Sequence, residues 1–442
     1  MRVLFVCYAE KTHFLGMVPL AWALRTAGHD VRVASQPKLT GVITGAGLTA
    51  VPVGEDHKLW SSASRFLTER FAELNPEVHE RIRRGVFPPF DMADDPGEVT
   101  WDYLAGAGPD IATAARNTNS SMIGELVEFA RFWRPDVVFW EQASFAGSIA
   151  AKVSGAAHAR FLWGLDFYGR WRTRFLRERA ARPGGDHGDP LATWLERETG
   201  KFGAGFSEDM TTGQFSVEQL PASQRVDTGL HTVPVRYTPY GGPAVVPPWL
   251  WAPPSKPRVA ITLGLTSSES FGGYLVDVQG ILDSLADLDI EVVATVAEKE
   301  QRKVRHVPGN ARVVAYAPLH VLAPTCSAIV HHAGAGTMAT ATLSGVPQLV
   351  LPDQADGWYT ARRIAELGAG LRIEPGDATG AAVRDAVVRL LGEASFGDSA
   401  GLLRAEVMAM PAPNHIVGEL VELTEKYRGR EHVRTAASGK GG

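Results

Sequence analysis

The residues best suited to chemistry lie in two stretches far apart in the chain. His13 follows the first apolar run, and histidine is the commonest general base near neutral pH, with a contribution of about 10²–10⁴-fold. Glu141 ends a later apolar run, where its carboxylate would orient the imidazole and stabilise its protonated form. A solvated strand end is the alternative role of Glu141. We therefore take His13 and Glu141 as the candidate catalytic pair, and Ser144 is close enough in sequence to join them.

The second stretch, "HHAGAGT", has the composition of an anion-binding turn. A strand is predicted to end at His331 and His332, and a helix to start near Gly336. Free amides and the dipole at a helix start favour an anion such as a diphosphate. The small residues, Gly334 among them, let the backbone come close. Thr337 adds a hydroxyl, and the His331 imidazole can donate one more hydrogen bond.

Further polar loops follow neighbouring predicted strands. Asp353 and Gln354 are placed to bind sugar hydroxyls, although Asp353 would equally serve as a cap for the following helix. Gly264 and Thr266 follow another strand and can meet the same diphosphate. The segment around Ala317 offers backbone groups to a nucleobase.

Two competing interpretations of the "HHAGAGT" stretch are weaker. Residues 334–339 satisfy a loose dinucleotide fingerprint, but that fingerprint normally follows the first strand, where His13 stands. Consecutive strand residues point to opposite faces, so His331 and His332 could not easily share a metal ion. We expect no metal here, and expect one of the two histidines to be structural.

The elements that must position these residues alternate between strand and helix in both halves of the chain. The strand-like runs are "VLFVCY", "DVRVAS", "LTAVPVG", "DVVFWE", "HARFLWG", "RVAITLG", "IEVVATV", "ARVVAYAP", "SAIVHH" and "PQLVLP". This alternation predicts two α/β domains, each with a doubly wound parallel sheet. Pro19 is typical of the first turn of a helix. The segments 55–110 and 168–200 break the rhythm and are predicted to be irregular.

A Pro/Gly-rich segment at 237–257 gives the clearest linker signal. The predicted units are an N-terminal domain at 1–236, the linker, a C-terminal domain at 258–427 and a disordered tail at 428–442. Ligands of open α/β sheets bind at the carboxyl ends of the strands. Two such edges facing one another would hold two substrates.

Composition excludes several classes of protein. The 442 residues carry 44 Lys and Arg against 49 Asp and Glu, a net charge of −5, with no basic block to bind nucleic acid. Two cysteines far apart do not form a disulfide framework. The first residues lack the apolar h-region expected of a signal peptide, and no apolar run approaches the ~18 residues that span a bilayer. We expect a cytoplasmic protein with no nucleic-acid or membrane partner.

On these motifs the chain resembles a GT-B glycosyltransferase, of the bacterial natural-product type that glycosylates macrolide and anthracycline-like polyketides. The resemblance covers nearly the whole chain to about residue 427. Its most specific stretches are "MVPLAWALRTAGHDVRVASQP", "GLTAVPVG", "WRPDVVFWEQASFAG", "HARFLWG", "PTCSAIVHHAGAGT" and "GVPQLVLPDQADG". Ala333 departs from the usual first glycine of the diphosphate turn, which matters only if the backbone there needs a positive φ.

The resemblance implies roles for particular residues. His13 would deprotonate the acceptor hydroxyl. His331, Gly336 and Thr337 would bind the diphosphate, and Asp353 and Gln354 would contact the donor sugar. A flat apolar aglycone needs an aromatic lining, although core packing accounts for part of the rings in 55–110. The acceptor candidates are Trp60, Phe66, Phe71, Phe90, Ser144 and Trp163.

The implied reaction is a metal-independent, inverting transfer from a nucleotide-activated sugar, usually a dTDP-deoxysugar, with no resident cofactor. Similar family members work with an activator protein that resembles a haem monooxygenase, so such a partner is expected here. A homodimer is one of the states left open.

Three other functions remain as alternatives. A nucleotide-sugar epimerase shares this architecture but needs no apolar acceptor wall. An NAD-dependent oxidoreductase would need its fingerprint after the first strand. A non-catalytic sugar-nucleotide binding protein would keep residues 331–354 and have no use for His13 with Glu141.

Overall fold

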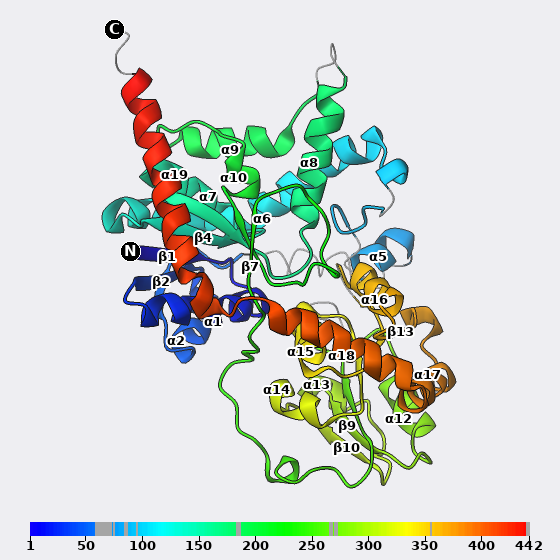
Figure 1. The fold of residues 1–442 in the computed structure, drawn as a ribbon. Helices are drawn as coiled ribbons and strands as arrows, with labels where there is room; N and C mark the ends of the chain where they lie inside the picture. Colours follow the sequence, from blue (N-terminus) through cyan, green and yellow to red (C-terminus); the bar gives the residue numbers. More distant parts are fainter. Residues whose placement is uncertain are drawn as a thin grey trace.

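Two parallel β-sheets organise the chain (Figure 1). The computed structural model describes residues 1–57, 73, 76–83, 87–93, 96–182, 187–264, 268, 273–353 and 356–438. The first sheet has the order β3-β2-β1-β4-β5-β6-β7 and the second β10-β9-β8-β11-β12-β13. The strands of the first sheet are β1 (Arg2–Val6), β2 (Asp30–Ser35), β3 (Thr49–Pro52), β4 (Val137–Glu141), β5 (Ala157–Phe161), β6 (Ser216–Glu218) and β7 (Thr232–Pro234). Those of the second are β8 (Arg258–Thr262), β9 (Glu291–Thr295), β10 (Ala311–Val314), β11 (Ala328–His331), β12 (Gln348–Val350) and β13 (Gly370–Arg372).

Helices connect and cover the strands. In the first domain they are α1 (Lys11–Thr26), α2 (Thr40–Gly45), α5 (Pro76–Arg83), α6 (Trp101–Trp133), α7 (Ala146–Ser154), α8 (Phe167–Ala180), α9 (Pro190–Gly200) and α10 (Asp209–Thr212). After the linker come α12 (Val278–Ser284), α13 (Glu298–Gln301), α14 (Leu319–Leu322), α15 (Ala335–Ser344), α16 (Gly357–Glu366), α17 (Gly380–Gly392), α18 (Ala394–Ala409) and α19 (Val417–Ser438). Short 3₁₀ turns lie at Pro37–Leu39, Pro96–Glu98, Pro248–Leu250, Ala323–Thr325, Pro375–Asp377 and Pro413–Ile416.

The first strand shows why these residues form a covered parallel sheet. Val3 and Phe5 pack with residues of α1 and α19, whereas Leu4 and Val6 pack with residues of α6 and α7. Successive strand side chains alternate between faces, so a strand with helices on both faces is apolar throughout. All pairings in both sheets are parallel, which brings the carboxyl ends of each sheet to one edge.

The predicted fold class, two doubly wound α/β domains, is confirmed. Three predictions about segments are wrong. The stretch 55–110, expected to be irregular, contains helix α5 and the beginning of α6. The stretch 168–200, expected to be irregular, contains most of helix α8 and all of α9. The tail expected from residue 428 is instead helical to Ser438, within α19.

Helix α19 also returns to the first domain, although the sequence assigns residues up to 427 to the second. Leu420 and Leu423 belong to the same core cluster as Phe5. Arg428 donates a hydrogen bond of 2.6 Å to Asp136, the residue just before β4. Figure 1 shows α18 lying along the second domain and α19 running beside the first. The last helix therefore packs into the core of the first domain.

Direct contacts join the two domains beside α16. The Trp358 Nε1 donates a hydrogen bond of 2.8 Å to the Phe90 carbonyl. The Leu165 amide donates one of 3.1 Å to Asp356 Oδ2. Within the part of the chain described here, no helix is both long and apolar enough to cross a bilayer.

Candidate active site

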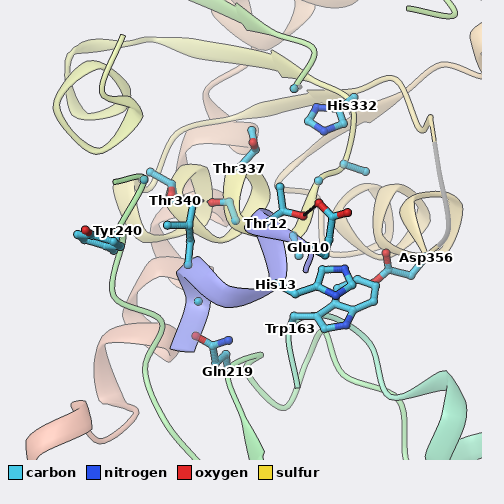
Figure 2. Close-up of a pocket in the computed structure, with 18 of the residues that line it drawn as sticks. Glu10, Thr12, His13, Trp163, Gln219, Tyr240, His332, Thr337, Thr340 and Asp356 are labelled. Carbon is cyan, nitrogen blue, oxygen red and sulfur yellow. Dashed lines mark hydrogen bonds between the residues drawn. The ribbon is translucent and has the colours of Figure 1, made fainter. Parts of the chain in front are cut away.

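A cavity of about 440 Å³ lies between the two domains. Its walls come from the loops after β1, β4, β5 and β6 in the first domain and after β8, β9, β10 and β11 in the second. Figure 2 shows side chains from both domains around it. The carboxyl edges of the two sheets thus face one another. Because ligands of open parallel sheets bind at this edge, such an arrangement can hold two substrates.

His13 stands in the first turn of α1, on the wall of this cavity. The helix begins at Lys11, so Pro19, predicted to open it, lies inside it instead. The imidazole stacks on the Trp163 indole with ring centroids 4.3 Å apart and planes 16° apart. Tyr8 meets it edge-on at 5.3 Å. These two rings fix the orientation of an imidazole whose side chain is 13% exposed.

Glu141, at the end of β4, lies fully buried behind His13. Its Oε2 is 3.4 Å from His13 Nδ1 and accepts a hydrogen bond of 3.2 Å from the Ala143 amide. Its Oε1 accepts a bond of 2.6 Å from the Ser144 hydroxyl, which in turn accepts one of 2.7 Å from the Tyr8 amide. A buried carboxylate is costly unless it is hydrogen-bonded or paired. Because Glu141 faces Nδ1, the Nε2 of His13 is left as the nitrogen that can take a proton.

Ser144 was also predicted to contact the acceptor, and the structure gives it a different place. Its side chain is fully buried and is not part of the cavity wall. It joins the Glu141 network instead, where it positions the carboxylate.

Of the two adjacent histidines, His332 lines the cavity and His331 does not. His331 is fully buried: its Nε2 lies 2.8 Å from Gln348 Oε1, and its Nδ1 accepts a bond of 3.1 Å from the Ala333 amide. The prediction that His331 binds the diphosphate is therefore corrected, because protein groups occupy both ring nitrogens. Burial lowers the pKa of each imidazole to about 4, so both are neutral near pH 7.

The glycines of this region make room for the His332 ring. A Cβ placed on Gly264 would lie 2.4 Å from His332 Nε2, and one on Gly334 would lie 2.5 Å from it. Gly264 also has φ +71°, where a side chain is strained. Both glycines line the cavity as predicted, and the structure adds this steric reason for their presence.

The start of α15 opens onto the cavity. Gly334 is its N-cap and supplies no side-chain cap, so the amides of the first turn lack intrahelical partners. Ala335, Gly336 and Thr337 all line the cavity, which is the geometry of an anion site at a helix start. Ala333, just before it, has φ +68°, a conformation that costs an L-residue roughly 1–2 kcal/mol. Alanine in place of glycine therefore does carry strain at this turn.

Of the two acids that follow β12, Asp356 lies on the cavity wall and the predicted Asp353 does not. Asp353 is buried at a separate small hollow beside Leu263 and Tyr274. Asp356 lines the main cavity and bonds the Leu165 amide across the domains. Burial raises its pKa to about 6, against the opposing effect of that hydrogen bond.

An aromatic surface covers the side of the cavity near His13. Phe90 and Trp163 line it as predicted, together with Phe87, Phe145 and Tyr168. Ala317, predicted to lie near a nucleobase, lines the cavity from the second domain, together with its neighbour Tyr316. The other predicted site residues, Trp60, Phe66, Phe71, Thr266 and Gln354, lie outside the described residues.

Among the residues of this wall that the sequence did not single out are Glu10, Tyr168, His332 and Asp356. Strand alternation signalled that only one of the two histidines would face a ligand. Asp356 follows the same strand as Asp353, so only the start of α16 decides which carboxylate reaches the cavity. Tyr168 lies in the segment predicted to be irregular.

Solved structures share this architecture. The crystal structure of glycosyltransferase VinC in complex with dTDP aligns with a TM-score of 0.85 and 38% identity, over 96% of this chain and all of that chain. Two parallel-sheet domains with a site between their carboxyl edges form the GT-B fold, which this chain shares with that glycosyltransferase.

Sequence comparison gives the family. The models for the N-terminal and C-terminal domains of erythromycin biosynthesis protein CIII-like proteins match residues 22–264 and 279–423. The 10-deoxymethynolide desosaminyltransferase of Streptomyces venezuelae is 46% identical over 97% of this chain and 98% of its own. The aklavinone 7-beta-L-rhodosaminyltransferase of Streptomyces galilaeus is 44% identical over 98% of each. The chain belongs to this family of antibiotic-biosynthesis glycosyltransferases.

Proposed function

We propose that this enzyme moves a deoxysugar from a dTDP-sugar to a hydroxyl of a macrolide or anthracycline-like aglycone, with inversion and with His13 as the general base. The observation that carries the proposal is the placement of His13, backed by buried Glu141, on the same cavity as the uncapped start of α15. A base and an anion site on facing sheet edges serve a transfer between two substrates.

The acceptor half of the reaction belongs to His13. Its Nε2 takes the proton of the acceptor hydroxyl as that oxygen attacks the anomeric carbon. The positive end of α1 disfavours the imidazolium, and the Glu141 carboxylate 3.4 Å from Nδ1 favours it. The stack on Trp163 keeps the ring from turning while the proton moves.

The donor half belongs to α15. As the acceptor oxygen bonds to the anomeric carbon, the bond to the diphosphate oxygen breaks and negative charge grows on the diphosphate. The amides of Ala335, Gly336 and Thr337 stabilise that charge. Such donors do the work of a metal ion, so we propose a metal-independent reaction with no resident cofactor. Within the described residues, no group of three acidic, histidine or cysteine side chains could hold a metal.

The aromatic surface supports an apolar acceptor. Phe87, Phe90 and Phe145 lie on the cavity beside His13, where a flat or macrocyclic aglycone would bury its apolar surface. The names of the two relatives above point to the same acceptor classes, since one names 10-deoxymethynolide and the other aklavinone.

A direct test is to titrate the protein with dTDP in EDTA. The second step is to assay transfer of the sugar from a dTDP-deoxysugar to 10-deoxymethynolide and to aklavinone. The proposal expects dTDP binding without metal, and product that gains the mass of one sugar. Conversion of the donor to an isomer with no transfer would favour an epimerase. dTDP binding with neither reaction would favour a non-catalytic binding protein.

Two partner predictions rest on the family resemblance. An activator protein resembling a haem monooxygenase is expected, and a homodimer is one of the possible oligomeric states. Sedimentation of the purified chain measures its mass and decides between monomer and dimer. Addition of a candidate activator to the transfer assay tests the other prediction, which expects a higher rate.

A further inference from the structure

Two tyrosines of the cavity wall have hydroxyls that no group in the described part of the chain binds. Tyr8 is the second residue after β1, and Tyr168 lies in the first turn of α8. Both line the cavity, and the two residues are only 5% and 9% exposed. Neither phenol oxygen is sealed from solvent. Because a largely buried polar group without a partner costs free energy, a pair of them in a cavity calls for a ligand.

The two rings connect the general base with the aromatic surface. Tyr8 meets the His13 ring edge-on, with centroids 5.3 Å apart. Tyr168 packs edge-on against Phe90 at 5.7 Å and against Phe145 at 6.2 Å. The hydroxyls therefore lie between the place where the acceptor loses its proton and the rings on which its apolar part would rest.

Both phenols are hydrogen-bond donors near neutral pH. Burial, followed by the charge of Glu141, raises the pKa of each phenol above its ordinary value. The Tyr168 phenol also raises the pKa of Tyr8, as a neighbouring titratable group does. A phenol that keeps its proton donates one hydrogen bond. This side of the cavity thus offers two neutral donors beside an apolar surface.

Resting on the proposed function, we infer that Tyr8 and Tyr168 bind a carbonyl oxygen of the acceptor, close to the hydroxyl that His13 deprotonates. A carbonyl oxygen has two lone pairs and can accept a hydrogen bond from each phenol. With the carbon skeleton on the phenylalanine rings and this oxygen on the phenols, few of the acceptor's hydroxyls can reach His13. The two tyrosines would thus select which hydroxyl receives the sugar.

The donor substrate does not fit this role. Its diphosphate is assigned to the start of α15 in the second domain, whereas both phenols belong to the first. Water can partner the hydroxyls when no acceptor is bound. An apolar acceptor group that displaces this water leaves both phenols unpaired, and a carbonyl oxygen does not. The site therefore discriminates between acceptors by a polar oxygen as well as by apolar surface.

The experiment uses two small probes that differ by one carbonyl oxygen, 1-tetralone and tetralin. Ligand-observed NMR with dTDP present gives the Kd of each probe for the wild type, Tyr8→Phe and Tyr168→Phe. The ratio of the tetralin Kd to the 1-tetralone Kd measures how strongly the site favours the carbonyl. We expect each substitution to lower this ratio about three- to tenfold, as the loss of one neutral hydrogen bond would.

The matched control is Tyr316→Phe, because Tyr316 lines the same cavity from the second domain and is half exposed. It should leave the ratio within about twofold of the wild type. In the transfer assay, Tyr8→Phe and Tyr168→Phe should raise the KM for the acceptor about three- to tenfold. The pH profile of kcat should stay the same, because phenylalanine keeps the ring contacts around His13.

A ratio that stays within about twofold of the wild type in either variant would overturn the inference, as would failure of 1-tetralone to bind. A weaker Kd for the dTDP-sugar with an unchanged ratio would assign the phenols to the sugar and overturn it. A lower kcat with an unchanged KM and a shifted pH profile would assign Tyr8 to His13 and overturn it too. Absence of transfer, with a ratio that falls as expected, would count against the proposed function and leave the carbonyl site standing.

Discussion

Replacing Gly334 with alanine tests whether the glycines of the anion-binding turn exist to seat the His332 ring. A Cβ at this position would lie 2.5 Å from His332 Nε2, well inside van der Waals contact. The same atom on Gly264 would lie 2.4 Å from that nitrogen. The two sites differ in backbone, because Gly334 has φ −57° and Gly264 has φ +71°.

The expected costs follow from this difference. Overpacking against the ring should lower the free energy of unfolding by about 1–3 kcal/mol in Gly334→Ala. Gly264→Ala should lose about 1–2 kcal/mol more, because alanine is strained in the left-handed conformation. Gly106, inside α6 with no neighbouring atom within 4 Å of its Cβ position, is the control. Gly106→Ala should be stabilising by about 0.5–1 kcal/mol.

Urea unfolding of each variant in the wild-type and His332→Ala backgrounds measures these costs. Without the imidazole, Gly334→Ala should cost less than about 0.5 kcal/mol, while Gly264→Ala should keep its backbone cost of about 1–2 kcal/mol. The Kd for dTDP should rise in Gly334→Ala with the wild-type ring, since the displaced imidazole crowds the start of α15. An equal cost of Gly334→Ala in both backgrounds would refute the steric explanation.

Three further predictions concern buried charged and titratable groups. Glu141→Gln should lower kcat by about 10²–10³-fold and leave the Kd for dTDP unchanged, because an amide cannot stabilise the His13 imidazolium. Steady-state kinetics and a dTDP titration of the variant measure both quantities. An unchanged kcat would contradict this role of Glu141. Burial raises the pKa of Glu218 from 4.5 to about 8, so the folded state keeps a proton that the unfolded state loses, and stability should fall as the pH rises through that window. Urea unfolding of Glu218→Gln should show a smaller loss over the same pH range, and an equal loss in both proteins would exclude Glu218 as the cause. Burial lowers the pKa of His331 from 6.5 to about 4, so stability should fall as the pH drops between these values, and His331→Gln should weaken that acid dependence in thermal unfolding.

The fold followed from local patterns because the strands of a covered parallel sheet are short apolar runs with few alternatives. The run "DVVFWE" predicts strand β4, and the position of Glu141 at its end predicts the pairing of this carboxylate with His13. Local patterns do not predict which part of the fold a helix packs against. Nothing in residues 417–438 tells that α19 leaves the second domain and packs beside Phe5 of the first.

The sequence predicts which loops at the strand ends form the candidate site, but not which side chain of each loop faces the cavity. His13, Gly334, Gly336 and Thr337 line the cavity as the sequence indicated. His331 and Asp353 do not, for the same reason in both cases. Which of two neighbouring side chains faces a ligand depends on the phase of a strand or helix against its neighbours, and a shift of one residue reverses it.

The central claim is that His13 is the general base on the cavity that binds the diphosphate. The most direct measurement is the kcat for sugar transfer by His13→Gln, with the Kd for dTDP measured on the same protein. We predict a kcat about 10²–10⁴-fold below that of the wild type and a Kd within about twofold. A kcat close to the wild-type value, with dTDP bound normally, would contradict the account.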